Sequence, residues 1–362
     1  MMEEKKLLIV AKNLVKHYPV KASGFTFSDE KVHALNNISF SLDYKQTLGL
    51  VGESGCGKTT TGRVILRVIE SDQGRLYFDK EADEINRLEA LESELNKEEN
   101  LKKQKQYLKD IARIKRETDF FSYPYSKLRS ERLKMQYIFQ DPYMSLNPKM
   151  HINEIITENL IENRIIKKSE RDKEAKKYLD IVGLSKDALY KYPHEFSGGQ
   201  RQRINIARAI ASNPKFIVCD EPVSSLDVSI QSQILNLLIQ IQKEFNISYL
   251  FIAHNLAIVF YISDYVAIMY TGRIVEIATS KVIYHSPLHP YTKLLMSVSP
   301  KIGEKKDYMK LPFIGEVPSL INYPKGCTFY DRCPVHKNIC SEEQPVLKKI
   351  VTEHRVACHV FS

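Results

Sequence analysis

Three groups of residues in this 362-residue chain have types and spacings that could do chemistry. Residues 52–59 read Gly-Glu-Ser-Gly-Cys-Gly-Lys-Thr and fit the phosphate-binding pattern G-x-x-x-x-G-K-[ST]. Asp220 and Glu221 follow the apolar residues 216–219. Four of the six cysteines lie in the last 36 residues, at Cys327, Cys333, Cys340 and Cys358. These groups predict a bound phosphate, a pair of carboxylates that take part in binding or catalysis, and a set of thiolate ligands.

The glycine-rich run predicts a nucleotide-phosphate loop. Backbone N–H groups at the start of a helix point at phosphate oxygens, and the helix dipole favours an anion there. Lys58 would add a positive charge for the β- and γ-phosphates, and Thr59 would offer its hydroxyl to Mg²⁺. An accidental glycine-rich turn is the competing explanation, and the complete match in a strand–loop–helix setting argues against it. The expected nucleotide-binding set here is Gly52, Ser54, Gly55, Cys56, Gly57, Lys58, Thr59 and Thr60.

The two carboxylates are expected at the end of a buried strand. Such a strand delivers the residues that follow it to the carboxyl edge of the sheet, which is where ligands of α/β proteins bind. Asp220 would hold Mg²⁺, directly or through water. Glu221 would lie beside the γ-phosphate and polarise the attacking water. A solvated acidic pair is the plainer alternative.

The elements that must position these residues can be read from the apolar pattern. Residues 7–10, 38–42 and 47–51 read as short strands, and the third runs directly into the phosphate loop. Residues 59–69 read as a helix whose apolar side carries Val64, Ile65, Val68 and Ile69. Residues 216–219 and 249–253 are buried-strand candidates.

Residues 79–118 interrupt this pattern. More than half of them are charged, acidic residues prevail in the first half and basic residues in the second. Leucines and isoleucines recur at helical spacing. Two antiparallel helices turning near residues 96–100 would bring the opposite charges together, and a mobile charged insertion is the alternative. We expect no catalytic role for the segment.

Composition favours a water-soluble globular chain without a membrane span. The hydrophobic fraction is 43%, and no apolar run approaches the ~20 residues that cross a bilayer. The charged N-terminus lacks the apolar core of a signal peptide. These features predict a cytoplasmic location. The net charge of +9 comes from scattered lysines, so we expect no nucleic-acid partner.

The order of the motifs resembles the ABC ATPases. Phe196 is followed by Ser197-Gly198-Gly199-Gln200, which matches the signature of that family, and Asp220-Glu221 lies downstream. The resemblance implies a P-loop NTPase of the α/β class, with a RecA-like core and a helical subdomain. It also implies that Ser197, Gly198, Gly199 and Gln200 bind the ATP held by another subunit. Their place at a helix start would by itself make a second anion site.

The same resemblance gives roles to residues that pattern alone would leave unassigned. Gln140 corresponds to the glutamine that touches Mg²⁺ and the attacking water, in a loop that faces the membrane subunits. His254 corresponds to the switch histidine at the γ-phosphate, and Tyr18 to the aromatic ring that stacks on adenine. Asp227 continues the pattern after the carboxylates. Ser225 and Asn255 stand where alanine and aspartate are usual, and neither change removes a catalytic group.

Three further segments resemble the oligopeptide and dipeptide (peptide/nickel) importer ATPases. They are residues 140–148, residues 286–292 and the cysteine-containing stretch from Gly326. The family implies two membrane permeases, an extracellular solute-binding protein and a second ABC ATPase subunit, which we expect to be a paralogue. It implies a peripheral location on the cytoplasmic face of the plasma membrane. We expect an ABC ATPase domain over 1–280, with a mostly helical subdomain over 120–210, and a small C-terminal domain over 281–362.

The four late cysteines are separated by five, six and seventeen residues. Zinc sites usually contain a C-x-x-C pair, which this spacing lacks. Members of the importer family carry a [4Fe–4S] cluster at such cysteines, so the resemblance favours a cluster, with Zn²⁺ and free thiols as the alternatives. The expected function is ATP hydrolysis that drives peptide import. A soluble ABC ATPase acting on ribosomes or nucleic acid is the alternative, and a silent ATP-binding regulator is a third that Glu221 and His254 oppose.

Overall fold

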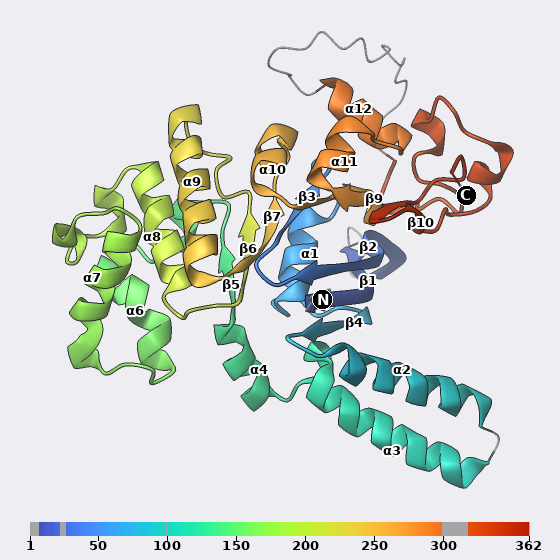
Figure 1. Ribbon diagram of the computed structural model, residues 1–362, viewed down its shortest axis with the longest axis horizontal. Coiled ribbons are helices and arrows are strands. Elements are labelled where there is room, and N and C mark those ends of the chain that lie inside the picture. The colour runs from blue at the N-terminus through green and yellow to red at the C-terminus, as the bar shows by residue number, and fades with distance from the viewer. Residues whose placement is uncertain (1–6, 22–26, 99, 299–317, 362) are drawn as a thin grey trace, which may run out of the picture. The chain divides into compact units, whose positions relative to one another are not determined.

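The computed structural model describes residues 7–21, 27–98, 100–298 and 318–361 of the chain (Figure 1). Its packing divides the chain into two compact units. The first comprises residues 1–43, 48–125 and 254–362, and the second comprises residues 44–47 and 126–253. The described part of the proline-rich C-terminal segment therefore belongs to the same unit as the phosphate loop. No helix among the described residues is long and apolar enough to cross a bilayer.

The first unit contains strands of two sheets. An antiparallel sheet has the order β2-β1-β4, built from β1 (Leu7–Lys21), β2 (Phe27–Asp43) and β4 (Gln73–Phe78). Other strands follow the order β10-β11-β9-β8-β3, and β3 pairs in parallel with β8. Their bounds are β3 (Thr47–Val51), β8 (Tyr265–Tyr270), β9 (Arg273–Thr279), β10 (Lys348–Val351) and β11 (His354–Val356). The C-terminal β11 thus pairs with β9, so the end of the chain extends this sheet.

Several helices of the first unit lie next to its strands in the sequence. Helix α1 begins directly after the phosphate loop, and α10 to α12 flank β8 and β9 in sequence (Figure 1). Their bounds are α1 (Lys58–Ile65), α10 (Leu256–Ile262), α11 (Ser280–His285) and α12 (Pro290–Val298), with 3-10 turns η1 (Phe120–Ser122), η5 (Tyr330–Arg332) and η6 (Asn338–Ser341).

The helix expected over residues 59–69 is shorter than the apolar pattern predicts. Helix α1 ends at Ile65, and Arg67 adopts a left-handed φ of 51°. The Val68 N–H bonds back to the Arg63 carbonyl oxygen at 2.9 Å across the left-handed Arg67, a backbone pattern that ends helices, and the Arg67 guanidinium donates to the Tyr123 carbonyl oxygen at 2.9 Å. Val64 and Ile65 are buried as expected, but Val68 is 64% exposed, so its assignment to the apolar side was wrong.

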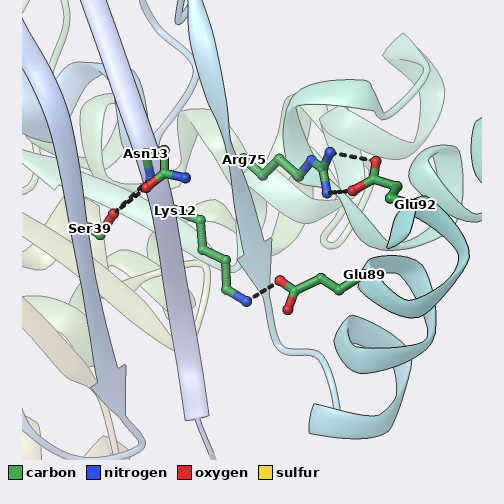
Figure 2. Close-up of polar contacts among 6 residues, drawn as sticks. All are labelled: Lys12, Asn13, Ser39, Arg75, Glu89 and Glu92. Atoms are coloured by element: carbon green, nitrogen blue, oxygen red, sulfur yellow. Dashed lines mark hydrogen bonds and ion pairs between the residues drawn. The ribbon is translucent and has the colours of Figure 1, made fainter. Parts of the chain in front are cut away.

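Residues 79–118 form two antiparallel helices, as the charge pattern predicts, rather than an irregular insertion (Figure 1). They are α2 (Ala82–Lys97) and α3 (Leu101–Thr118). The hairpin buries Ile85, Leu88, Ile111 and Ile114 against Tyr77 of β4. Figure 2 shows how α2 is tied to the sheet: Arg75 of β4 pairs with Glu92 through two hydrogen bonds of 2.5 and 2.6 Å, and Lys12 of β1 pairs with Glu89.

The second unit has a three-stranded parallel sheet with helices around it. Its order is β7-β6-β5, built from β5 (Met135–Ile138), β6 (Phe216–Asp220) and β7 (Ser248–Ile252). Strands β6 and β7 are buried along their whole length, which agrees with their apolar sequences. The helices and 3-10 turns are α4 (Tyr125–Leu133), α5 (Pro142–Ser145), α6 (Ile152–Glu162), η2 (Lys168–Glu170), α7 (Arg171–Ile181), η3 (Lys186–Ala188), η4 (Pro193–Glu195), α8 (Gly198–Ile210) and α9 (Val228–Phe245).

Candidate functional site

The phosphate loop of the first unit has the conformation that its glycines predict. Strand β3 is fully buried and leads into residues 52–57, after which α1 begins. Gly57 has φ 101°, and a Cβ at this position would lie 2.4 Å from the carbonyl oxygen of Ala34. No residue with a side chain fits there. Ser54 and Gly55 are exposed, while Thr59 and Thr60 are half-buried at the start of α1.

Lys58 lies inside this loop. Its side chain is buried, and Nζ donates to the carbonyl oxygens of Gly52 at 2.9 Å and Glu53 at 2.8 Å. Burial raises the pKa of the neighbouring Cys56 thiol, while the Lys58 ammonium opposes the shift. The loop therefore has the features of an anion site: a cation held by backbone carbonyls at a helix start, beside a neutral thiol.

Glu53 is a residue that the sequence reasoning missed. Its backbone N–H donates to the Tyr291 hydroxyl at 3.0 Å, and its carboxylate accepts two hydrogen bonds of 3.1 Å from Arg332. Tyr291 lies in α12 and Arg332 in η5, so both come from the C-terminal part of the chain. The pattern treats this position as variable, so the motif gave no signal for it.

Tyr18 and His254 both lie in the first unit. Tyr18 is half-buried on β1, and the Lys16 ammonium lies 5.6 Å from the centre of its ring. His254 is exposed and follows β7 in the chain by two residues. The roles expected for Tyr18 at adenine and for His254 at the γ-phosphate stay predictions.

The carboxylates of the second unit lie at the end of β6, as predicted. Asp220 is the last residue of the strand and is 2% exposed, and the Tyr137 hydroxyl donates to its Oδ2 at 2.5 Å. Glu221 follows with a left-handed φ of 45°. Its carboxylate accepts a hydrogen bond of 2.8 Å from the side-chain amide of Gln140. The structure therefore brings Gln140 and Glu221 together. Tyr137 was not singled out by sequence, although its place on an adjacent strand could have suggested it.

Asp227 begins α9 as its N-cap residue, with its side chain exposed. Gln231 of the same helix donates to the carbonyl oxygens of Val223 and Leu226 at 3.0 and 2.9 Å. These bonds fix the loop between the carboxylates and α9.

The Ser-Gly-Gly-Gln segment begins α8 in the same unit. Ser197 is the N-cap: its Oγ accepts from the backbone N–H of Gln200, and its own backbone N–H donates to the side-chain oxygen Oε1 of Gln200. This capping box explains why the helix starts here. A Cβ on Gly199 would lie 2.6 Å from Ile230 of α9, so the second glycine allows the two helices to pack. Ser197 and Gln200 are exposed at the helix N-terminus.

The four late cysteines gather at the C-terminal end of the first unit. Burial raises the pKa of Cys327 to about 12, and the thiols of Cys340, Cys333 and Cys358 add to the shift. Among the described residues, however, no group of three His, Cys, Asp or Glu side chains has a geometry that could hold a metal ion. The geometry therefore does not support the zinc alternative or the expected cluster.

Comparisons with known proteins agree with these features. The model of the ABC transporter family matches residues 35–224, more than half of the chain, and the model of the oligopeptide/dipeptide transporter C-terminal region matches residues 275–340. Among curated proteins, the chain is 40% identical to the oligopeptide transport ATP-binding protein AppF of Bacillus subtilis, covering 98% of each chain. It is 39% identical to the dipeptide transport ATP-binding protein DppF of Haemophilus influenzae, covering 99% of this chain and 98% of that one.

Solved structures show the same fold. A dimeric post-hydrolysis ATP-binding cassette bound to ADP and Pi aligns with a TM-score of 0.58 at 21% identity, over 75% of this chain and 99% of that one. The cassette cbiO1 of Clostridium perfringens also gives 0.58 at 21% identity, over 78% and 92%.

The fold, the phosphate loop and the family match define an ABC ATPase, with the α/β nucleotide-binding fold that the sequence predicted. Within that class, the chain belongs to the family of ATP-binding subunits of oligopeptide and dipeptide ABC transporters. The alternative of a soluble ABC ATPase acting on ribosomes or nucleic acid is not favoured by these relatives.

Proposed function

We propose that this chain binds and hydrolyses ATP to drive an ABC importer of oligopeptides or dipeptides. The single observation that carries the proposal is the full-length similarity to named peptide-transport ATPases, which covers the phosphate loop, the carboxylates and the C-terminal region alike. Lys58 held in the loop and Glu221 held by Gln140 are the local features that such an enzyme needs.

In the proposed reaction, the loop amides and Lys58 bind the β- and γ-phosphates. Glu221 accepts a proton from the water that attacks the γ-phosphorus, the bond to the β–γ bridging oxygen breaks, and ADP and phosphate leave. Thr59, Asp220 and Gln140 would hold Mg²⁺, which neutralises phosphate charge when bound. Tyr18 would stack on adenine, Asp227 would support the nucleotide site, and His254 would contact the γ-phosphate.

The Ser-Gly-Gly-Gln segment is proposed to act on the ATP of a second ABC ATPase subunit, which we infer to be a paralogue. Support comes from the exposed N-terminus of α8, where Ser197 and Gln200 meet solvent. Anions bind at such helix starts. Each ATP would then be enclosed by the phosphate loop of one subunit and the signature segment of the other.

Two membrane permeases and an extracellular solute-binding protein complete the proposed importer, which places this chain at the cytoplasmic face of the membrane. The segment around Gln140 carries exposed apolar side chains that suit a permease contact: Phe139 is 42%, Tyr143 66% and Met144 86% exposed. Exposed apolar patches of this kind mark protein interfaces.

We also propose the predicted domain division, with an ATPase domain over 1–280 that includes a helical subdomain over 120–210, and a C-terminal domain over 281–362. Residues 299–317 of the last segment lie outside the described residues. The match of the C-terminal family model to residues 275–340 supports a boundary near 280.

We also propose that the four late cysteines hold a [4Fe–4S] cluster. They are Cys327, Cys333, Cys340 and Cys358. The proposal rests on the chemistry and number of these side chains: four cysteine thiolates are the usual ligands of such a cluster, and Cys333, Cys340 and Cys358 lie near enough to Cys327 to raise its pKa. Iron and acid-labile sulfide in anaerobically purified protein would support it. Stoichiometric zinc, or thiols without metal, would contradict it.

The proposed function is tested by uptake of labelled peptides into cells or proteoliposomes that contain the assembled importer. Lys58→Ala should abolish uptake while the complex still assembles, because the phosphates lose their cation. Uptake at the wild-type rate would show that this chain does not power the import. Competition with unlabelled di- and oligopeptides defines the preferred length.

A further inference from the structure

Glu53 is contacted from three sides within the first unit. Its carbonyl oxygen accepts from Lys58 Nζ at 2.8 Å, its N–H donates to the Tyr291 hydroxyl, and its carboxylate binds both terminal nitrogens of Arg332. One contact comes from the phosphate loop itself and two come from the C-terminal region. A residue tied in this way has little freedom, so its backbone conformation depends on Tyr291 and Arg332.

Arg332 is itself firmly held. Its side chain is 11% exposed, Nη1 also donates to the Tyr270 hydroxyl at 3.2 Å, and the guanidinium lies 5.7 Å from the ring centre of Phe329. Burial disfavours its charge, but the bonds to Glu53 and Tyr270 raise the pKa of Arg332 on balance. Arg332 lies directly before Cys333, so its ion pair with Glu53 connects the cysteine-containing segment to the phosphate loop.

Tyr291 is positioned by a second set of buried polar groups. Glu276 of β9 is fully buried and accepts from the backbone N–H groups of Leu288 at 2.7 Å and His289 at 3.0 Å. His289 Nδ1 in turn accepts from the Tyr291 N–H at 3.1 Å. These bonds fix the first turn of α12. Tyr291 is fully buried, with its ring 4.5 Å from that of Tyr270.

Because Glu53 carries a carboxylate, its contacts affect how well the loop can bind phosphates. A carboxylate beside a loop that binds phosphates repels them unless it is neutralised. The fork of Arg332 pairs both carboxylate oxygens, and the Tyr291 hydroxyl satisfies the Glu53 N–H. The C-terminal region thereby reduces the repulsion between Glu53 and bound phosphates, and it restricts the backbone of the loop at Glu53.

We propose that Tyr291 and Arg332 are positioning residues for nucleotide binding, through which the C-terminal region holds Glu53 and fixes the phosphate loop. This inference rests on the proposed function, since the loop is taken to bind ATP. It adds that the cysteine-containing region is coupled to the ATP site within the same chain. By linkage, bound nucleotide also strengthens the docking of that region.

Binding of the slowly hydrolysed analogue ATPγS to the full-length chain tests the proposal. Arg332→Met keeps the side-chain volume and leaves Glu53 unpaired, so the dissociation constant should rise by about 5-fold to about 150-fold, the range typical for coupled sites. Adding Glu53→Gln to Arg332→Met should recover most of the loss, because it removes the uncompensated charge. Arg332→Lys should bind with intermediate affinity, since lysine keeps the charge but not the fork.

Arg355→Met is the matched control, because Arg355 is an exposed arginine of β11 in the same region. It should bind ATPγS as the wild type does. A purely structural role for Arg332 predicts that Glu53→Gln adds to the defect instead of relieving it, and that result would overturn the proposal. So would wild-type affinity in a folded Arg332→Met protein.

Tyr291→Phe decides the matter if Arg332→Met does not fold, because it removes a single hydroxyl. Weaker ATPγS binding supports the proposal, and unchanged binding contradicts it. Failure of the wild-type chain to bind ATPγS at all would instead contradict the proposed function, so the two failures are distinguishable.

Discussion

The side-chain amide of Gln140 donates to the carboxylate of Glu221 at 2.8 Å, and this bond joins the loops that follow β5 and β6. Glu221 adopts a left-handed φ of 45°, which is unfavourable for a residue with a Cβ. The bond from its N–H to the Ile252 carbonyl oxygen, at 2.9 Å, holds the backbone in this conformation. Strain of this kind clusters at functional sites, where it aims a side chain. Gln140 therefore orients the carboxylate that we assign as the general base.

Gln140→Ala should slow ATP hydrolysis by the assembled importer about 10-fold to about 100-fold, as loss of an orienting group does. Binding of ATPγS should weaken less than turnover, because the phosphate loop and the other two proposed Mg²⁺ ligands, Thr59 and Asp220, are untouched. Steady-state ATPase rates and binding isotherms of the same preparations check both parts. Equal losses in binding and in turnover would contradict an orienting role.

The phosphate loop and both carboxylates could be predicted from sequence because short-range rules determine them. Few other local structures fit glycines that need left-handed backbone, a lysine at a helix start, and acidic residues directly after a buried apolar run. The same local rules offered the α2–α3 hairpin as one of two alternatives, because antiparallel helices satisfy both the opposite charges of the two halves and the helical spacing of the apolar residues.

The contacts of Glu53 could not be predicted in this way. Arg332 lies 279 residues away in the chain, and nothing in its local sequence indicates a partner. The end of α1 was misplaced for a different reason. Arg67, which is not a glycine, adopts the left-handed conformation that ends the helix, and the apolar pattern through Val68 gives no sign of it.

Ser197→Arg should block hydrolysis at the phosphate loop of the partner subunit while this chain still binds ATP. The larger cation would occupy the helix start that we assign to the partner's γ-phosphate. The measurement uses an importer in which only one subunit carries the substitution, with nucleotide occupancy determined for each subunit. Loss of ATP binding to this chain would contradict a shared site.

Glu92→Gln should loosen the α2–α3 hairpin by about 1 to 2 kcal/mol. Glu92 pairs with Arg75 of β4, as Figure 2 shows, and with Lys115 of α3 at 3.0 Å. Burial raises the pKa of Glu92, but these two cations lower it overall. Amide hydrogen exchange in α2 and α3 reports the change. Glu94→Gln, on the exposed face of α2, is the control and should leave exchange unaltered. Equal effects of the two substitutions would count against the pairing.

His289 should make stability depend on pH. Burial lowers its pKa to about 4, below its usual value of 6.5. Between these two pH values, His289 is protonated in the unfolded chain and neutral in the folded chain. Stability from this group is complete above pH 6.5 and falls as pH drops toward about 4. Between pH 6.5 and 5 the loss is about 2 kcal/mol.

His289→Asn removes the titrating group and leaves an oxygen that can accept from the Tyr291 N–H. Urea unfolding at pH 7 and 5 should show a smaller pH effect in this variant by about that 2 kcal/mol. The same pH dependence in both proteins would show that His289 is not responsible.

ATP turnover by the assembled importer with Glu221→Gln in this chain tests the central claim most directly. Glutamine keeps the shape of the side chain and a hydrogen-bond partner for Gln140, but it cannot accept the proton of the attacking water. We expect hydrolysis at this site to fall about 10²-fold to about 10⁴-fold, with ATP still bound. Hydrolysis at the wild-type rate with ATP bound would contradict the assignment of this chain as an ATP-hydrolysing subunit that uses Glu221.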